Sequence, residues 1–410
     1  MKQMRPTTIV GGKAVLAGEV REAAVRFADA VIVAIGELEP EDGDEIVDAR
    51  GKLIAPGLVD YGVFAVDKPA FHFGGITRAA LMPDQRPLLD LPSRVSYIAK
   101  SGKPDFWVHP LAAATRNLDG ENLAELALMR EAGALGVATG RRWIGNSGVM
   151  LRLAQYAAML DLPLVAHAED SGIAGTSVAT AGEMATRMGL QAAPAQAESL
   201  AIMRDLAIAR MAGAHIHFRQ VSTRAGLDLV RAVKAQGERV TAGITPAHIH
   251  LSDLAIGDFR SFARLSPPLR CEDDRRAVLE AIADGTIDMI SSGHDPRGPE
   301  DKRLPFADAE PGMAGAEVLL ATTLSLVRDS VIAMPRVFEL LAANPARLLK
   351  VKAGALEEGW EADIAIVDPD RPWIVDSRKM EAAAGNTPFD GQPMQGRVTA
   401  LWKGGVRVDS

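Results

Sequence analysis

Short apolar strands alternate with amphipathic helical stretches between residues 55 and 354, and this alternation limits the folds open to the chain. Leu162–His167 and Ala214–Phe218 have the length and apolar character of buried strands, whereas Ser147–Leu160 has helical spacing. Such repetition predicts parallel strands joined by helical crossovers, and a (β/α)8 barrel usually takes about 250 residues. We therefore predict an α/β protein with a TIM-like barrel over residues 55–354. Further predicted elements are the strand Thr286–Ile290 and the helices Asn122–Ala132, Glu198–Met211, Ala225–Gln236 and Asp274–Ala283.

Both ends of the chain carry short β-rich runs separated by glycine and acidic turns. Val31–Ile35 belongs to the first block, and Ala362–Val367 and Val398–Trp402 belong to the last. Runs of this kind predict small antiparallel sheets. We expect residues 1–54 and 355–410 to pair into one composite domain, a small β-sandwich beside the barrel.

Composition excludes several classes of function. The net charge of −8 and the lack of a basic cluster argue against a nucleic-acid or anionic-membrane partner. No stretch reaches the roughly 20 uncharged apolar residues that cross a bilayer, and the N-terminal residues lack the apolar core of a signal peptide. The single cysteine, Cys271, cannot form an internal disulfide. We expect a soluble, cytoplasmic protein.

The first crossover of the predicted barrel is short. The first strand should end near Val66 and the second should begin near Ile76, which leaves only Asp67–Gly75 between them. A parallel crossover usually needs a dozen or more residues, and Pro69 and two glycines make this segment a poor helix sequence. We predict that the first barrel helix is missing, and that another segment or another subunit covers the apolar surface it would leave.

A series of short motifs resembles the dihydroorotase branch of the amidohydrolases. Ala55–Asp60 is similar to the strand that opens the barrel in that family, and His167–Asp170 is similar to a later strand end. Each motif is weak alone, but their order and spacing make the resemblance specific over nearly the whole chain. The others are Gly74–Thr77 with Met82 and Pro83, Pro194–Glu198, Gly213–His217 before Val221–Thr223, Thr245 with Pro246, Ser266–Arg270, Pro311 with Gly312, Asn344–Ala346 and Asn386–Phe389.

The resemblance implies hydrolysis of a cyclic amide by metal-activated water, with a carboxylate that shuttles protons. The ligands would project from the C-terminal ends of different barrel strands. The first histidine pair of the family falls at Gly62 and Phe64, neither of which has a donor atom. The bridging acid or carboxylated lysine should follow the next motif, but Gly136–Gly140 supplies neither. The first histidine pair and the bridging acid that the resemblance implies are therefore absent from this sequence.

Of the other ligand, catalytic and substrate-binding positions that the resemblance implies, only one keeps the residue type of the family. His167 matches the third histidine, but the fourth falls at Gln220 and the catalytic aspartate falls at Gly293. The arginine and asparagine that would hold the substrate fall at Val66 and Asp84. We therefore expect no bound metal or other cofactor, and no catalysis by the mechanism of the family.

Other polar side chains could rebuild a site, but structural roles are favoured for all of them. His248 and His250 have the i, i+2 spacing of a displaced metal pair, whereas His294 and Asp295 are adjacent and should point to opposite faces of a strand. His167 itself could be a hydrogen-bonded relic or a ligand of a changed site. Three arginines could line the vacated mouth and bind an anion, with solvated loop charge as the simpler reading: Arg141, Arg142 and Arg297.

A few further polar residues have simple expected roles. His215 and His217 share one face near the start of a strand, where packing or hydrogen bonding is favoured over metal binding. His72, with Asp67 and Lys68, is expected at the surface in the shortened crossover. Glu169 and Asp170 are expected to cap the helix that follows.

Three functions stay open on these residues. The preferred one, implied by the resemblance, is a non-catalytic dihydroorotase homologue of pyrimidine biosynthesis that assembles with the catalytic chain of aspartate transcarbamoylase, as part of a homo- or hetero-oligomer. The second is a divergent cyclic-amide hydrolase of the dihydroorotase, hydantoinase or allantoinase type, with zinc held by a rebuilt site. The third is a small-molecule sensor that keeps the pocket for binding.

Overall fold

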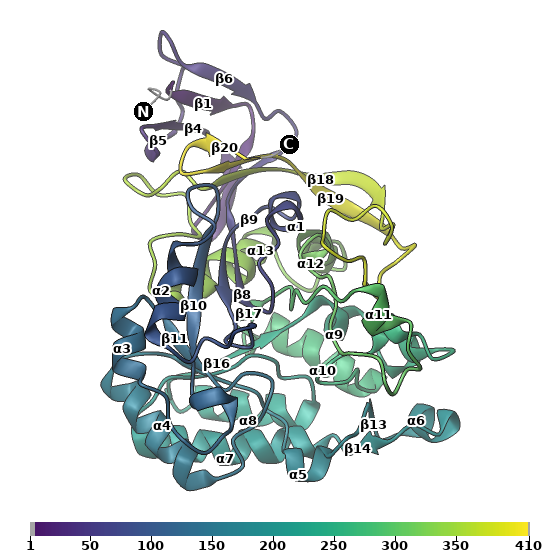
Figure 1. The fold of residues 1–410 in the computed structure, drawn as a ribbon. Helices are drawn as coiled ribbons and strands as arrows, with labels where there is room; N and C mark the ends of the chain where they lie inside the picture. The colour runs from purple at the N-terminus through teal and green to yellow at the C-terminus, as the bar shows by residue number, and fades with distance from the viewer. Residues whose placement is uncertain (1–4, 409–410) are drawn as a thin grey trace.

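A computed structural model describes residues 5–408 and shows a barrel with a β domain packed at one end (Figure 1). The barrel sheet has eight parallel strands in the order β17-β16-β15-β12-β11-β10-β9-β8, so each neighbours the next along the chain. The predicted TIM-like barrel is confirmed. Its strands are β8 (Leu58–Val63), β9 (Ile76–Leu81), β10 (Trp107–Ala113), β11 (Gly136–Ala138), β12 (Leu164–Ala166), β15 (Ile216–Phe218), β16 (Val240–Ile244) and β17 (Met289–Ile290).

Helices follow the strands and cover the outside of the sheet. The helix predicted over Asn122–Ala132 begins only at Leu126, because Asn122 accepts a backbone hydrogen bond from Arg116 and Leu123 forms a β-bridge with Thr115. Among the described residues, no helix is long and apolar enough to cross a membrane. The main helices are α2 (Pro92–Lys100), α3 (Leu126–Glu131), α4 (Ser147–Met159), α7 (Gln196–Ala212), α8 (Arg224–Lys234), α10 (Glu272–Ala283) and α12 (Leu319–Arg328).

Short elements complete the barrel and its loops. The short helices are α5 (Ser171–Ala174), α6 (Glu183–Met188), α9 (Pro246–His250), α11 (Pro299–Lys302), α13 (Met334–Phe338) and α14 (Asn344–Leu349), with the π-helical turn η4 (Glu339–Ala343) between the last two. The remaining ones are the 3₁₀ turns η1 (Arg116–Leu118), η2 (Asp253–Ile256) and η3 (Ser261–Ala263) and the paired strands β13 (Ala179–Thr180) and β14 (Ala192–Ala193).

The crossover between β8 and β9 contains a short helix, α1 (Lys68–Phe73), so the prediction of a missing first helix was wrong. Pro69 lies in the first turn, where its lack of an N–H costs no helical hydrogen bond. Phe71 is fully buried and stacks on Phe106 at 4.9 Å between ring centroids, and this burial outweighs the weak helix propensity of the segment. With α1 in place, the apolar surface of β8 and β9 is covered within the chain.

The first barrel strand, β8, is linked to the segment that follows the last one, β17, by a buried carboxylate. Asp60 of β8 accepts a hydrogen bond from the backbone N–H of Ser292 at 2.9 Å and another from its hydroxyl. Farther along, the backbone N–H of Phe64 donates to the carbonyl of His294 at 2.9 Å. Burial raises the pKa of Asp60. These bonds fix the top of β8 beside the segment that follows β17.

The β domain consists of two packed sheets built from both ends of the chain (Figure 1). Phe27 and Trp402 meet edge to face in its core at 6.0 Å. Most strand pairs are antiparallel as predicted, but β1–β6 and β2–β7 are parallel. The four-stranded sheet is β5 (Val31–Gly36), β4 (Ala24–Ala28), β1 (Thr7–Val10) and β6 (Glu45–Asp48); the six-stranded sheet is β20 (Val406–Arg407), β19 (Pro393–Lys403), β18 (Ile364–Ile374), β7 (Leu53–Pro56), β2 (Lys13–Leu16) and β3 (Glu19–Glu22).

A buried ionic network joins the β domain to the barrel. Arg78 of β9 donates from Nε to Asp363 at 2.8 Å and also pairs with Glu361. Lys403 of β19 donates to the other oxygen of Asp363 at 2.9 Å. Both cations lie over the ring of Trp107, at 4.3 Å for Arg78 and 4.4 Å for Lys403. Two cations and two acids thus balance one another where the domains meet.

We predict that Arg78→Met destabilises the protein by about 3–5 kcal/mol, because it leaves a buried carboxylate short of a partner. Arg21→Met is the matched control, since Arg21 pairs with Glu19 on an exposed strand, and its loss should cost less than about 1 kcal/mol. Urea unfolding followed by circular dichroism measures both. Equal effects of the two substitutions would show that the network does not hold the domains together.

Candidate functional site

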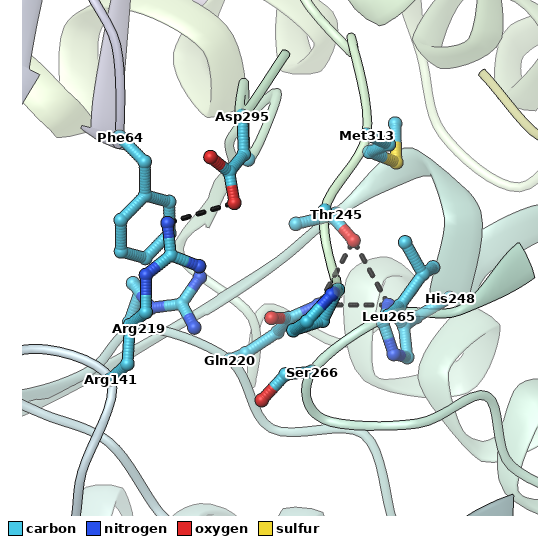
Figure 2. A pocket seen from close by; sticks show the side chains of 13 residues that line it. Phe64, Arg141, Arg219, Gln220, Thr245, His248, Leu265, Ser266, Asp295 and Met313 are labelled. Carbon is cyan, nitrogen blue, oxygen red and sulfur yellow. Dashed lines mark hydrogen bonds and ion pairs between the residues drawn. The ribbon is translucent and has the colours of Figure 1, made fainter. Parts of the chain in front are cut away.

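A small pocket opens at the top of the barrel, where the C-terminal ends of the strands meet (Figure 2). Its cavity is about 30 Å³, which holds one or two water molecules and is far below the roughly 300–1,000 Å³ of a typical ligand site. The lining residues come from the segments that follow β8, β11, β15, β16 and β17: Phe64, Arg141, Arg219, Gln220, Thr245, His248, Leu265, Ser266, Gly293, Asp295, Pro311, Gly312 and Met313.

Two arginines surround the ring of Phe64. The guanidinium carbon of Arg141 lies 3.6 Å from the ring centroid, and that of Arg219 lies 4.9 Å from it (Figure 2). A cation over an aromatic face contributes about 0.5–2 kcal/mol, more when water is excluded. Phe64 is only 8% exposed. The position at which the sequence resemblance implies a histidine ligand therefore lies against positive charge.

Gly62 makes room for one of these cations. A Cβ added at Gly62 would approach the Cγ and Cδ atoms of Arg219 to 3.3 Å, and its φ of +91° disfavours any larger residue. Gly293 is similar, because its φ is +59° and an added Cβ would meet Thr245 at 3.0 Å. A histidine at position 62 or an aspartate at position 293 would be strained by the positive φ and would require Arg219 or Thr245 to move.

The acids of the mouth are bound to arginine and to backbone. Asp295 accepts hydrogen bonds from Arg141 at 2.8 Å and from Arg297 at 3.2 Å. Asp84 accepts the backbone N–H of Arg141 at 3.0 Å, and burial raises the pKa of the Asp84 carboxyl despite the nearby guanidiniums. Both arginines donate to the same oxygen of Asp295, Oδ2, so this carboxylate is held as their shared counter-ion.

Gln220, Thr245 and His248 form a closed hydrogen-bonded set. The amide nitrogen of Gln220 lies 2.8 Å from Nδ1 of His248 and 2.9 Å from the hydroxyl oxygen of Thr245. Nε2 of His248 lies 3.1 Å from the carbonyl oxygen of Pro267, so Nε2 donates and Nδ1 accepts. Burial lowers the pKa of His248 to about 3. Both ring nitrogens of this neutral imidazole are occupied.

His167 is placed at the end of β12 but does not line the pocket. Its Nε2 lies 3.7 Å from an oxygen of Glu169, and its backbone N–H donates to Thr139. Burial raises the pKa of Glu169, but His167 and Arg270 together hold that pKa below its usual value. Asp170 caps α5 as predicted, whereas Glu169 faces His167 and does not cap the helix.

The other candidate histidines also have protein partners. Nε2 of His250 lies 3.0 Å from the carbonyl oxygen of Thr322, and Nε2 of His294 lies 3.3 Å from Asp67. Asp67 is only 8% exposed, so the prediction that it lies at the surface was wrong. His72 is half-buried in α1, with Nε2 3.2 Å from the carbonyl oxygen of Asp105. His215 and His217 both lie within hydrogen-bonding distance of the hydroxyl of Thr241, at 3.3 and 3.0 Å.

The residues at the top of the barrel do not fit a zinc site. Within residues 5–408, no three His, Cys, Asp or Glu side chains are grouped to hold a metal ion. Zinc needs three or four such donors in tetrahedral array. Here the nearest equivalents are a phenyl ring, two glycines and an amide, with two guanidiniums beside them. A divalent cation at this position would meet positive charge instead of lone pairs.

The lining of the pocket differs in part from the residues expected there. Of the three arginines expected at the mouth, Arg141 lines the pocket, Arg142 is exposed, and Arg297 donates to Asp295 without lining the pocket. Val66 is 38% exposed and outside the pocket. Arg219 was missed, although its place directly before Gln220 at a predicted strand end is a signal that could have found it.

Comparison with known proteins identifies the family. A family model described as dihydro-orotase-like matches residues 51–226. A dihydroorotase from Pelotomaculum thermopropionicum is 36% identical over 414 residues, covering 97% of this chain and 97% of that protein. The chain belongs to the dihydroorotase family. A second dihydroorotase, from Syntrophotalea carbinolica, is 35% identical and covers 91% of each chain.

Solved structures of this family's wider fold agree with the architecture. The L-hydantoinase from Arthrobacter aurescens superimposes with a TM-score of 0.89 over 99% of this chain and 96% of that one, at 23% identity. The dihydropyrimidinase from Brevibacillus agri gives a TM-score of 0.85 at 19% identity, covering 98% of this chain and 95% of that one. The likeness is one of fold, and it places this member of the dihydroorotase family on an amidohydrolase barrel.

Buried neutral histidines predict an acid-sensitive fold. Burial lowers the pKa of His217 and of His248 to about 3, well below the usual value near 6.5. The unfolded chain therefore binds protons that the folded chain does not, so stability present above pH 6.5 is lost as the pH falls toward 3. We predict that His248→Gln reduces the stability lost between pH 7 and pH 5 by about 2 kcal/mol. Urea unfolding at both pH values tests this, and an unchanged pH dependence would contradict it.

Proposed function

We propose that this protein is a non-catalytic member of the dihydroorotase family that acts in the cytoplasm as an assembly subunit for the catalytic chain of aspartate transcarbamoylase in pyrimidine biosynthesis. The observation that carries the non-catalytic half is the Arg141–Phe64–Arg219 stack, which stands where the family resemblance implies a metal ligand. The proposed assembly with aspartate transcarbamoylase rests on the resemblance to the dihydroorotase family.

Hydrolysis of a cyclic amide needs an activated water and a proton shuttle. Gly293 stands where the resemblance implies the shuttle, and the nearby Asp295 is held by Arg141 and Arg297. The oxygen of Asp295 that these arginines bind is occupied by two charge-assisted hydrogen bonds. The residues present therefore provide neither a metal that would activate a water molecule nor a free carboxylate that would shuttle its protons.

The alternative is a divergent cyclic-amide hydrolase with a rebuilt zinc site. It is favoured by the relatives named dihydroorotase and by one contact, His167 beside Glu169 at 3.7 Å. That pair supplies two donors of the three or four that zinc requires. Arg270 also lies 3.8 Å from Glu169, which adds a cation beside the two donors. This contact therefore supports the alternative only in part.

A surface feature supports an assembly role. Four large apolar side chains are exposed on the neighbouring helices α4 and α7, at the end of the barrel far from the β domain (Figure 1). Methionines are common on binding surfaces because their flexible side chains adapt to a partner. The four are Met159, which is 73% exposed, Leu200 at 42%, Met203 at 51% and Met211 at 66%.

Zinc content and turnover separate the two functions. For protein purified with added zinc, we predict well under one zinc per chain by plasma mass spectrometry and no dihydroorotase turnover above the uncatalysed rate. His167→Ala should change neither value, because on our proposal the His167 ring contacts Glu169 and holds no metal. Stoichiometric zinc that is lost together with turnover in His167→Ala would establish the alternative.

Copurification tests the assembly role. We predict that the native protein elutes from size exclusion with the catalytic chain of aspartate transcarbamoylase from the same organism, and that Met203→Glu weakens this association at least tenfold by burying a charge in the interface. Leu254→Glu is the control, since Leu254 is 65% exposed and lies in η2, outside helices α4 and α7. Elution of the wild type as an isolated monomer, with the partner present, would exclude the role.

A further inference from the structure

We infer that the pocket at the top of the barrel is a binding site for a small oxyanion, a carboxylate or phosphate group, centred on Arg219. The inference does not depend on the proposed assembly role, because it rests only on the charges and the cavity of this chain. It assigns a ligand to a position from which the metal ligands of the family have been lost.

Arg219 is a buried cation without a counter-ion. Its side chain is 5% exposed, and no carboxylate in residues 5–408 comes within 4.0 Å of it. Its Nε atom is buried and has no hydrogen-bond partner. Burial, with a smaller effect from Arg141, lowers the pKa of Arg219 to about 10, so the group still carries its charge at pH 7. Buried charges in proteins are normally paired, and this one faces the cavity.

Asp84 and Asp295 act on the charge of Arg219 only from beyond 4.0 Å, and neither forms an ion pair with it. Asp295 is already shared between Arg141 and Arg297. The pKa of Asp84 is raised by burial, which weakens it as a counter-ion, and its free oxygen has no hydrogen-bond partner. Three arginines thus share two carboxylates around the mouth, and the unbalanced charge is on Arg219.

The cavity supplies one further donor beside Arg219. Ser266, whose hydroxyl can donate, lines the pocket (Figure 2). Arg141 presents its guanidinium flat against Phe64 at the rim. The cavity is only about 30 Å³, so it has no room for a ring, and a ligand would present its oxyanion group to Arg219 from the mouth. The site is separate from the position at which the family holds its substrate acid, because that position falls at Val66, outside the pocket.

The test is thermal unfolding of the full chain in sodium phosphate, sodium acetate or sodium chloride at matched ionic strength. We expect phosphate or acetate to raise the Tm of the wild type above its value in chloride, by about 4 °C at a hundredfold excess over Kd. The more effective of the two identifies the group. Arg219→Met should have a higher Tm than the wild type in chloride, because the unpaired charge is gone, and should not respond to either oxyanion.

Arg130→Met is the control, because Arg130 is exposed on α3 and should leave the response unchanged. If Arg219→Met does not fold, Arg219→Lys gives the same test, since a lysine ammonium cannot reproduce the planar fork and should weaken binding at least tenfold. A wild type that responds to neither oxyanion, or an Arg219 variant that responds like the wild type, would overturn the inference.

Discussion

The stacking of two guanidiniums on the ring of Phe64 is the interaction on which the chemistry of the barrel mouth depends. Arg141 and Arg219 place two positive charges within 5 Å of the ring centroid. A metal site needs lone pairs that converge on an ion, and a general base needs a carboxylate free of strong partners. The stack places guanidiniums where converging lone pairs would be needed, and Arg141 also donates to Asp295, an acid that lines the same pocket. On the proposed function, these contacts account for the absence of both the metal site and the free base.

The residues that stand at the implied ligand positions pack against one another and against their neighbours at the barrel mouth. Gly62 leaves the space that Arg219 fills, and Gly293 leaves space beside Thr245, which in turn holds Gln220. A histidine restored at position 62 would therefore require the Arg219 side chain to move. This packing also explains how the barrel keeps its family fold: Asp60 still joins β8 to the segment after β17 below the altered layer.

Much of the fold could be predicted from the sequence, because strand–helix alternation and β-rich ends are local patterns. The helix α1 could not, since its stability comes from the burial of Phe71 against Phe106 and not from its own propensity. The missing ligands at Gly62 and Phe64 were visible as residue types. The side chain that fills their place could not be predicted from the sequence. Arg219 comes from the end of a strand more than 150 residues away, and only the closed barrel brings it to Phe64.

The most direct measurement of the central claim is anomalous X-ray diffraction at the zinc edge, from crystals grown with excess zinc. Our account predicts continuous density for the Arg141 and Arg219 side chains against Phe64 and no anomalous peak at the top of the barrel. A strong peak there, coordinated by His167 and two or more further side chains with both arginines turned away, would contradict it.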